Sequence, residues 1–91
     1  MIMERRTYNQ LKREILEIFL YSENVTSEDV AEDLNCDIHN ARMCLLRLFR
    51  QQLVTREIVH LEPWGKPVFE YNITDKGFDR LIYYKSLDLV E

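Results

Sequence analysis

Hydrophobic positions in the first part of the chain recur every three to four residues, which is the period of an amphipathic helix. They predict three helices, over about 7–22, 27–34 and 37–52. Thr7 with Gln10, and Thr26 with Asp29, have the spacing of a capping box at a helix start. The residues predicted to face inward are Leu11, Ile15, Ile18, Phe19, Val30, Ala31, Leu34, Ile38, Ala41, Cys44, Leu45, Leu48 and Phe49.

The breaks between these helices must come from residues other than glycine and proline, because residues 1–60 contain neither. Asn35 suits a tight turn between the second and third helices, since asparagine tolerates left-handed backbone. Asp37 can then cap the third helix.

From residue 53 the pattern changes to that of strands. Residues 53–60 and 68–73 are rich in β-branched and aromatic residues and flank the turn-forming sequence EPWGKP, which predicts a β-hairpin over about 53–73. Thr74 can cap a last helix over about 75–87. The residues of this helix predicted to face inward are Phe78, Leu81 and Ile82. The surplus apolar residues are Tyr83, Tyr84, Leu87, Leu89 and Val90.

The 91 residues are enough for one small domain, over 1–91, with an α+β, mainly α fold. With the tight turn at Asn35 and Cys36, the hairpin junctions LVTR (53–56) and YNITDKG (71–77) resemble those of the winged helix-turn-helix domain of MarR-like and PadR-like transcription regulators. Within the helix pair the matching residues are Val30, Ala31, Leu34, Ala41, Leu45 and Leu48. The chain departs from the family at Asn35 and Gln52, where many members carry glycine.

The resemblance implies double-stranded DNA as a partner, with the helix over 37–52 in the major groove and the hairpin tip as a wing on the backbone or the minor groove. Arg42 is suited to guanine, and Arg47, Arg50 and Arg56 are suited to phosphates. The predicted DNA-binding residues are His39, Asn40, Arg42, Met43, Arg47, Arg50, Arg56, Trp64 and Lys66. The alternatives are a solvated face for the four arginines and a Trp64 folded back onto the hairpin.

The net charge of −4 hides a strong segregation of charge along the chain. Residues 17–37 carry seven acidic residues and no basic one, whereas residues 38–60 carry four arginines and one glutamate. The acidic run is either a solvated face or a docking surface for a basic protein partner. A winged-helix protein-interaction module, using this acidic helix or the aromatic C-terminal surface, is therefore the alternative function.

The surplus apolar residues at the end of the last helix also admit two interpretations. They either pack back on the first helix or form the surface of a homodimer, and we favour the dimer. Two half-sites on DNA would raise the weak affinity of a single copy.

Several classes of function are excluded by what the sequence lacks. The first ten residues, MIMERRTYNQ, contain no signal-peptide core, and apolar runs are only about four residues long, so we expect an intracellular, cytoplasmic protein with no membrane segment. No phosphate loop or nucleophile elbow is present, so we expect neither an enzyme nor a cofactor. A small-molecule effector, with a pocket between the first and last helices, is left open.

The cysteines are better explained by packing than by metal binding. Cys36, His39 and Cys44 have poor spacing for a zinc site, and Cys44 belongs to the predicted buried face, so we expect no metal. Cys36 at the turn keeps a redox or intersubunit role as an alternative.

Overall fold

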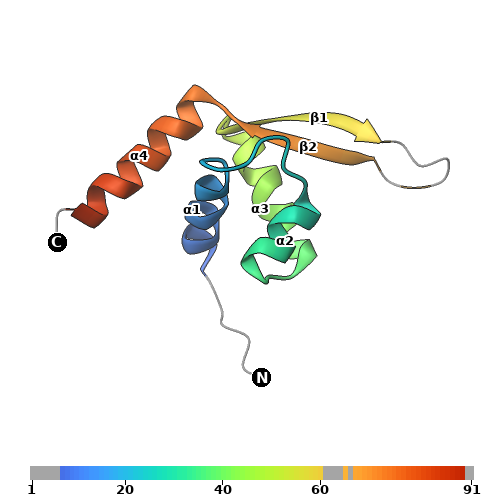
Figure 1. The fold of residues 1–91 in the computed structure, drawn as a ribbon, viewed down its shortest axis with the longest axis horizontal. Helices are drawn as coiled ribbons and strands as arrows, with labels where there is room; N and C mark the ends of the chain where they lie inside the picture. The colour runs from blue at the N-terminus through green and yellow to red at the C-terminus, as the bar shows by residue number, and fades with distance from the viewer. Residues whose placement is uncertain (1–6, 61–64, 66, 90–91) are drawn as a thin grey trace, which may run out of the picture.

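The computed structural model describes residues 7–60, 65 and 67–89 and shows helices and one antiparallel hairpin in the predicted order. The elements are α1 (Tyr8–Ile18), α2 (Ser27–Leu34), α3 (Ile38–Arg50), β1 (Val54–His60), β2 (Val68–Ile73) and α4 (Asp75–Leu89). The first three helices form a bundle, the hairpin crosses one end of it and projects to one side, and α4 leaves on the other side (Figure 1). The predicted α+β, mainly α fold is confirmed.

The starts of α1 and α2 form as their capping residues predict. The Thr7 hydroxyl accepts the Gln10 N–H at 3.2 Å, and the Gln10 side chain accepts the Thr7 N–H at 2.9 Å. Thr26 and Asp29 make the same reciprocal pair at 3.1 and 3.0 Å. Each pair satisfies two backbone donors that a helix start leaves without partners.

The turn between α2 and α3 is set by Asn35, which adopts the left-handed conformation at φ 51° and ψ 50°. The N–H of Cys36 then donates to the Ala31 carbonyl at 3.0 Å, which closes the end of α2. Asp37 caps α3 by accepting the His39 N–H at 2.6 Å. The predicted tight turn between two consecutive helices is confirmed.

Helix α1 ends at Ile18, before the predicted end near residue 22. The N–H groups of Leu20 and Tyr21 donate to carbonyls three residues earlier, each at 3.0 Å, so the last helical turn tightens and stops. The chain then extends, and Val25 exchanges two backbone hydrogen bonds with Tyr71 of β2, at 3.0 and 2.8 Å. Helix α1 therefore ends early, and the chain after it pairs with β2, a segment distant in the sequence. The local hydrophobic period does not reveal this pairing.

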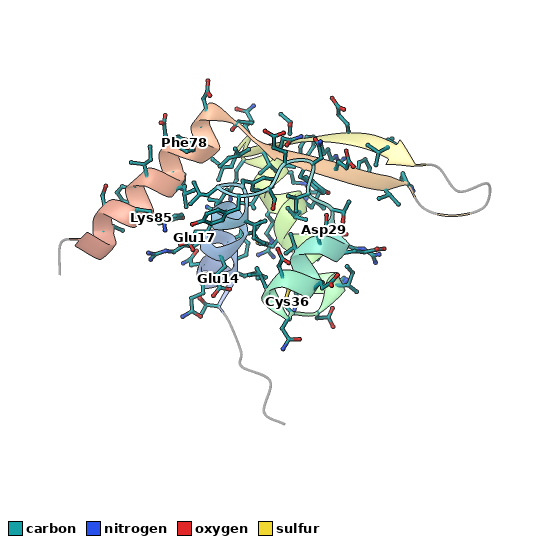
Figure 2. All side chains as sticks on the ribbon, in the orientation of Figure 1. Glu14, Glu17, Asp29, Cys36, Phe78 and Lys85 are labelled. Atoms are coloured by element: carbon teal, nitrogen blue, oxygen red, sulfur yellow. The ribbon has the colours of Figure 1, made fainter. Side chains whose placement is uncertain are left out.

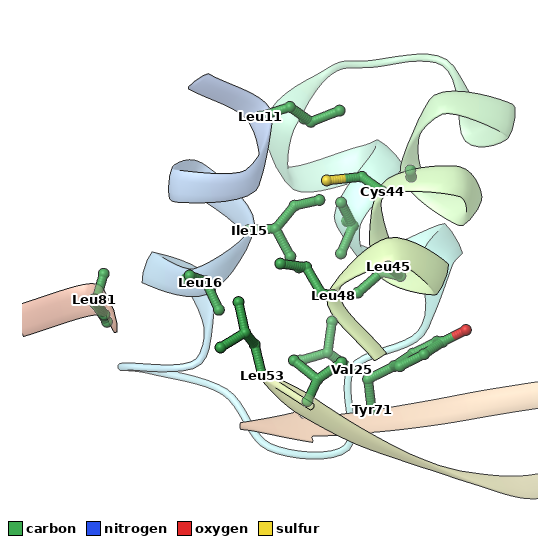
Figure 3. Packing of buried hydrophobic residues seen from close by; sticks show 13 residues of the cluster. Leu11, Ile15, Leu16, Val25, Cys44, Leu45, Leu48, Leu53, Tyr71 and Leu81 are labelled. Carbon is green, nitrogen blue, oxygen red and sulfur yellow. The ribbon is translucent and has the colours of Figure 1, made fainter. Parts of the chain in front are cut away.

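The core lies between α1, α2 and α3 and continues to the inner face of the hairpin (Figure 3). Its fully buried side chains include Ile15 and Leu16 of α1, Leu45 and Leu48 of α3, and Leu53 before β1. Leu16 was not predicted to face inward, yet it is fully buried in α1, the helix on which α4 packs. Other predicted core residues are only half-buried, namely Ile18, Phe19, Ala31, Leu34, Ile38 and Phe49.

The hairpin has a defined register, from Val54 opposite Ile73 to Ile58 opposite Phe69, and a bulge follows Ile58. Alternate residues therefore share a face, and the face of Val54 and Tyr71 is buried against the bundle. Farther out on the same face, Ile58 is 54% exposed, because this part of the hairpin extends beyond the helical bundle.

Helix α4 buries a different face from the predicted one. Leu81 is inward and 1% exposed, but Phe78 and Ile82 are 45% and 49% exposed, so their predicted burial is wrong. Tyr84, which was predicted to be surplus, is half-buried and packs against the core. The helix carries apolar residues on several sides, so spacing alone did not identify the side that meets α1.

Candidate nucleic-acid interface

The outward face of α3 is polar and basic. All six predicted DNA-binding residues of this helix are exposed: His39, Asn40, Arg42, Met43, Arg47 and Arg50. They are opposite Ala41, Cys44, Leu45 and Leu48, which hold the helix against the core. The structure therefore presents these predicted residues together on one surface.

Arg47 is oriented by an aromatic ring that the sequence interpretation did not include. Its guanidinium carbon lies 4.7 Å from the centre of the Tyr8 ring, at the start of α1. The two residues border a shallow hollow that also includes His39, Asn40 and Met43. Burial raises the pKa of the Tyr8 phenol, so Tyr8 is neutral and offers Arg47 an uncharged ring face.

Arg56 on β1 contacts two aromatic rings from other elements. Its guanidinium carbon lies 4.3 Å from the ring centre of Phe49, in the last turn of α3, and 4.3 Å from that of Phe69, on β2. Arg56 is half-buried, unlike the exposed arginines of α3. Phe49 was recognised only as a core residue, and the position of Phe69 depends on the strand register.

A second hollow, of about 330 Å³, lies between the start of α2, the middle of α3 and the hairpin. Arg42 and Arg56 bring two guanidinium groups to it, and Leu46 and Phe69 are among its apolar residues. Glu28 also lines the hollow, so one carboxylate of the acidic run lies beside the basic surface. We expect Glu28 to reduce the local positive potential.

The other acidic residues of α2, which include Asp29 (Figure 2), are exposed on the surface. The Asp29 carboxylate is occupied in the capping box at Thr26. Glu32 and Asp33 are exposed near the end of the helix. Part of the acidic run therefore has a structural role at a helix start, where negative charge is favourable.

Helix α4 exposes apolar side chains on two flanks. Phe78 and Ile82 are one helical turn apart, as are Tyr83 and Leu87, and the last two are 56% and 49% exposed. Figure 2 shows Phe78 pointing away from the bundle. Of the predicted dimer residues, Tyr83 and Leu87 are exposed, Tyr84 is half-buried, the Leu89 side chain is not described, and Val90 lies outside the described residues.

The contact of α4 with α1 includes one ion pair at its edge. Lys85 lies 3.6 Å from Glu17, which also pairs with Arg13 at 3.7 Å (Figure 2). These side chains are partly exposed, so the pair contributes little to stability. Leu81 of α4 belongs to the core, and Tyr84 packs against it.

The two cysteines differ in environment. Cys44 is buried in the core, as predicted, and burial raises the pKa of its thiol to about 11. The thiol therefore stays protonated near neutral pH and is a poor nucleophile or metal ligand. Cys36 is half-buried at the turn between α2 and α3 (Figure 2).

Trp64 and Lys66, at the predicted wing tip, lie outside the described residues.

In the part of the chain that the structure describes, no helix is both long enough and apolar enough to cross a membrane.

Comparisons with known proteins identify the fold. No protein-family model matches the chain, and no curated protein sequence matches it. Its structure is similar to a PadR-like transcriptional regulator from Bacillus cereus, at 26% identity and a TM-score of 0.69, over 88% of this chain and 82% of that one. A mutant of MepR from S. aureus superposes with a TM-score of 0.72 at 16% identity, over 85% of this chain and 54% of that one.

A third similar structure contains nucleic acid. Streptococcus pneumoniae FabT, solved in complex with DNA, matches with a TM-score of 0.68 at 16% identity, over 87% of this chain and 53% of that one. The chain thus spans about half the length of MepR and FabT and most of the length of the PadR-like protein. The winged helix-turn-helix fold implied by the sequence resemblance is confirmed.

Proposed function

We propose that this chain binds double-stranded DNA as a small dimeric transcription regulator, with α3 in the major groove. The observation that carries the proposal is the outward face of α3, where Arg42, Arg47 and Arg50 are exposed on the helix after the tight turn. Two solved structures with the same fold, an S. aureus MepR mutant and FabT, contain bound DNA, which supports the proposal. The proposed function involves no catalytic step and no cofactor.

Within this interface the residues of α3 divide into two groups. His39 and Asn40, in the first turn, face base edges, Arg42 pairs with a guanine, and Met43 contacts a thymine methyl group. Arg47 and Arg50, farther along the helix, hold phosphates. The hairpin tip, with Trp64 and Lys66, lies against the backbone or in the minor groove.

The dimer is proposed from the exposed apolar flanks of α4. A helix that is apolar on several sides is typical of a buried helix, yet among the described elements α4 packs mainly on α1 and β2. A two-fold axis beside α4 would cover Tyr83 and Leu87 and provide two α3 helices for two half-sites. Linking two weak contacts in one complex raises affinity through effective concentration.

The first experiment is fluorescence anisotropy of the full chain with a random-sequence duplex, from about 20 to 200 mM salt. Counterion release makes phosphate binding steeply dependent on salt, so we expect log affinity to fall linearly with log salt. Binding that is absent or independent of salt would contradict DNA binding and would favour the protein-interaction function.

The arginines of α3 give a prediction that separates base contacts from phosphate contacts. Once a preferred duplex has been selected, Arg42→Ala should cost about 1–3 kcal/mol on it and relax preference at one base position. Arg50→Ala should instead weaken binding to all duplexes and lower the salt slope by about 0.9. Anisotropy on the preferred duplex and on a scrambled one measures both effects.

Arg13→Ala, on α1 and outside both the proposed DNA-binding face and the proposed dimer interface, is the matched control and should leave both affinity and salt slope unchanged. If Arg42→Ala and Arg50→Ala cause equal losses on both duplexes, the proposed division between bases and phosphates is wrong.

A further inference from the structure

Arg56 differs from the other arginines of the candidate interface because it connects two parts of the fold. Phe49 belongs to α3 and Phe69 to β2, and the Arg56 guanidinium carbon lies 4.3 Å from the centre of each ring. A planar guanidinium stacks well on aromatic rings, and two such contacts to separate elements hold those elements together.

The strand register places this contact at the base of the projecting hairpin. Arg56 is opposite Tyr71, and Phe69 is the diagonal neighbour on the same face. On one side of Arg56 along β1, Val54 is 2% exposed in the core, and on the other side Ile58 is 54% exposed. Arg56 therefore lies between the buried and the exposed parts of the hairpin. The hairpin as a whole projects beyond the bundle (Figure 1).

We propose that Arg56 is a positioning residue, which fixes the projecting part of the hairpin relative to α3 through Phe49 and Phe69. The sequence suggested a phosphate contact for Arg56, but a guanidinium engaged with two rings and half-buried has less of its surface available to a phosphate. A protein that places α3 in one groove and its hairpin on the adjacent backbone needs a fixed angle between them.

The inference rests on the proposed function for its effect on DNA, but its structural part can be tested without DNA. Arg56→Met introduces an unbranched, apolar side chain at this position and removes the planar cation. We expect amide hydrogen exchange in the hairpin beyond Arg56, at the hydrogen-bonded pair Glu57 and Glu70, to become at least about fivefold faster. Exchange in the middle of α3 should be unchanged.

A double-mutant cycle with Phe69→Leu then identifies the role of the ring contact in DNA binding. We expect Arg56→Met alone to weaken duplex binding by about three- to tenfold. In the Phe69→Leu background the same change should have little further effect on either affinity or exchange, because the contact is already lost. Phe49→Leu provides a second cycle if the Phe69 variant does not fold.

Arg50→Met is the control, since Arg50 is exposed on α3 and is proposed to bind phosphate. The effect of Arg50→Met on duplex affinity should be the same in the wild-type and the Phe69→Leu backgrounds. Unchanged hairpin exchange in Arg56→Met would overturn the positioning role. An equal loss of affinity from Arg56→Met in both backgrounds would also overturn it and would assign Arg56 to phosphate. Should the wild-type chain bind no duplex, the proposed function fails, and the exchange measurement still decides whether Arg56 fixes the hairpin.

Discussion

Gly77→Ala is expected to lower the free energy of unfolding by about 3 kcal/mol, although the same change stabilises most helices. Gly77 lies in the first turn of α4, and a Cβ there would collide with the backbone carbonyl oxygen of Leu53 and lie 2.8 Å from Cγ1 of Ile73. The obstacle is main chain, which cannot move aside as a flexible side chain would. The alanine must therefore push α4 away from the start of β1.

The hydrogen bonds around Thr74 explain why the two segments approach so closely. The Thr74 hydroxyl donates to the Gln52 carbonyl at 2.7 Å and accepts the Gly77 N–H at 3.0 Å. The Thr74 N–H donates to the Leu53 carbonyl at 3.1 Å. The start of α4 is thus fastened directly to the turn between α3 and β1, and only a residue without a side chain fits at Gly77.

Urea unfolding monitored by circular dichroism measures this effect, because the midpoint and the slope of the transition give the free energy of unfolding. Lys76→Ala, at the exposed neighbouring position, is the control and should change stability by less than about 0.5 kcal/mol. A Gly77→Ala protein as stable as the wild type would show that the close contact with Leu53 is not maintained in solution.

Glutamate on the exposed flanks of α4 is expected to dissociate the proposed dimer. Tyr83 and Leu87 are 56% and 49% exposed in the single chain, so Tyr83→Glu and Leu87→Glu should leave its fold intact. An unpaired polar group buried in an interface costs about 1–3 kcal/mol, and two-fold symmetry buries it twice, so the loss is about 2–6 kcal/mol. We therefore expect monomers at concentrations where the wild type is dimeric.

Sedimentation velocity of the wild type and both variants over a range of concentrations tests this expectation. Asn9→Glu, at an exposed position of α1, introduces the same charge away from α4 and should leave the dimer unchanged. A wild type that is monomeric throughout, or two variants that remain dimeric, would remove α4 from the proposed interface. Tyr84→Glu is a poor test, because Tyr84 is half-buried and packs against the core of its own chain.

The net acidity of the chain does not prevent the proposed DNA binding, because charge is separated by element. Arg42, Arg47 and Arg50 are exposed on α3, which has no acidic residue, whereas α2 carries four of the 16 acidic residues and no basic one. Glu28 is the exception, since it lines the same hollow as Arg42. The salt dependence of affinity, rather than net charge, decides how many phosphates the surface can hold.

The sequence by itself determined the features that depend on near neighbours in the chain. Both capping boxes, the left-handed turn at Asn35 and the Asp37 cap could be predicted because their partners are two to four residues apart. The chain also departs from the family at Gln52, which nonetheless adopts the left-handed conformation at φ 64° that glycine would favour. The exposed basic face of α3 followed from the helical period, since burying one face exposes the other.

Only the tertiary structure decided the features that depend on distant segments. The early end of α1 reflects the pairing of Val25 with Tyr71, and the buried face of α4 reflects the close approach of Gly77 to Leu53. The ring partners of Arg56 became visible once the register placed Phe69 diagonally across the hairpin. A hydrophobic period shows that a helix or strand has an apolar face to bury. Which neighbour covers that face is decided by how the elements pack together.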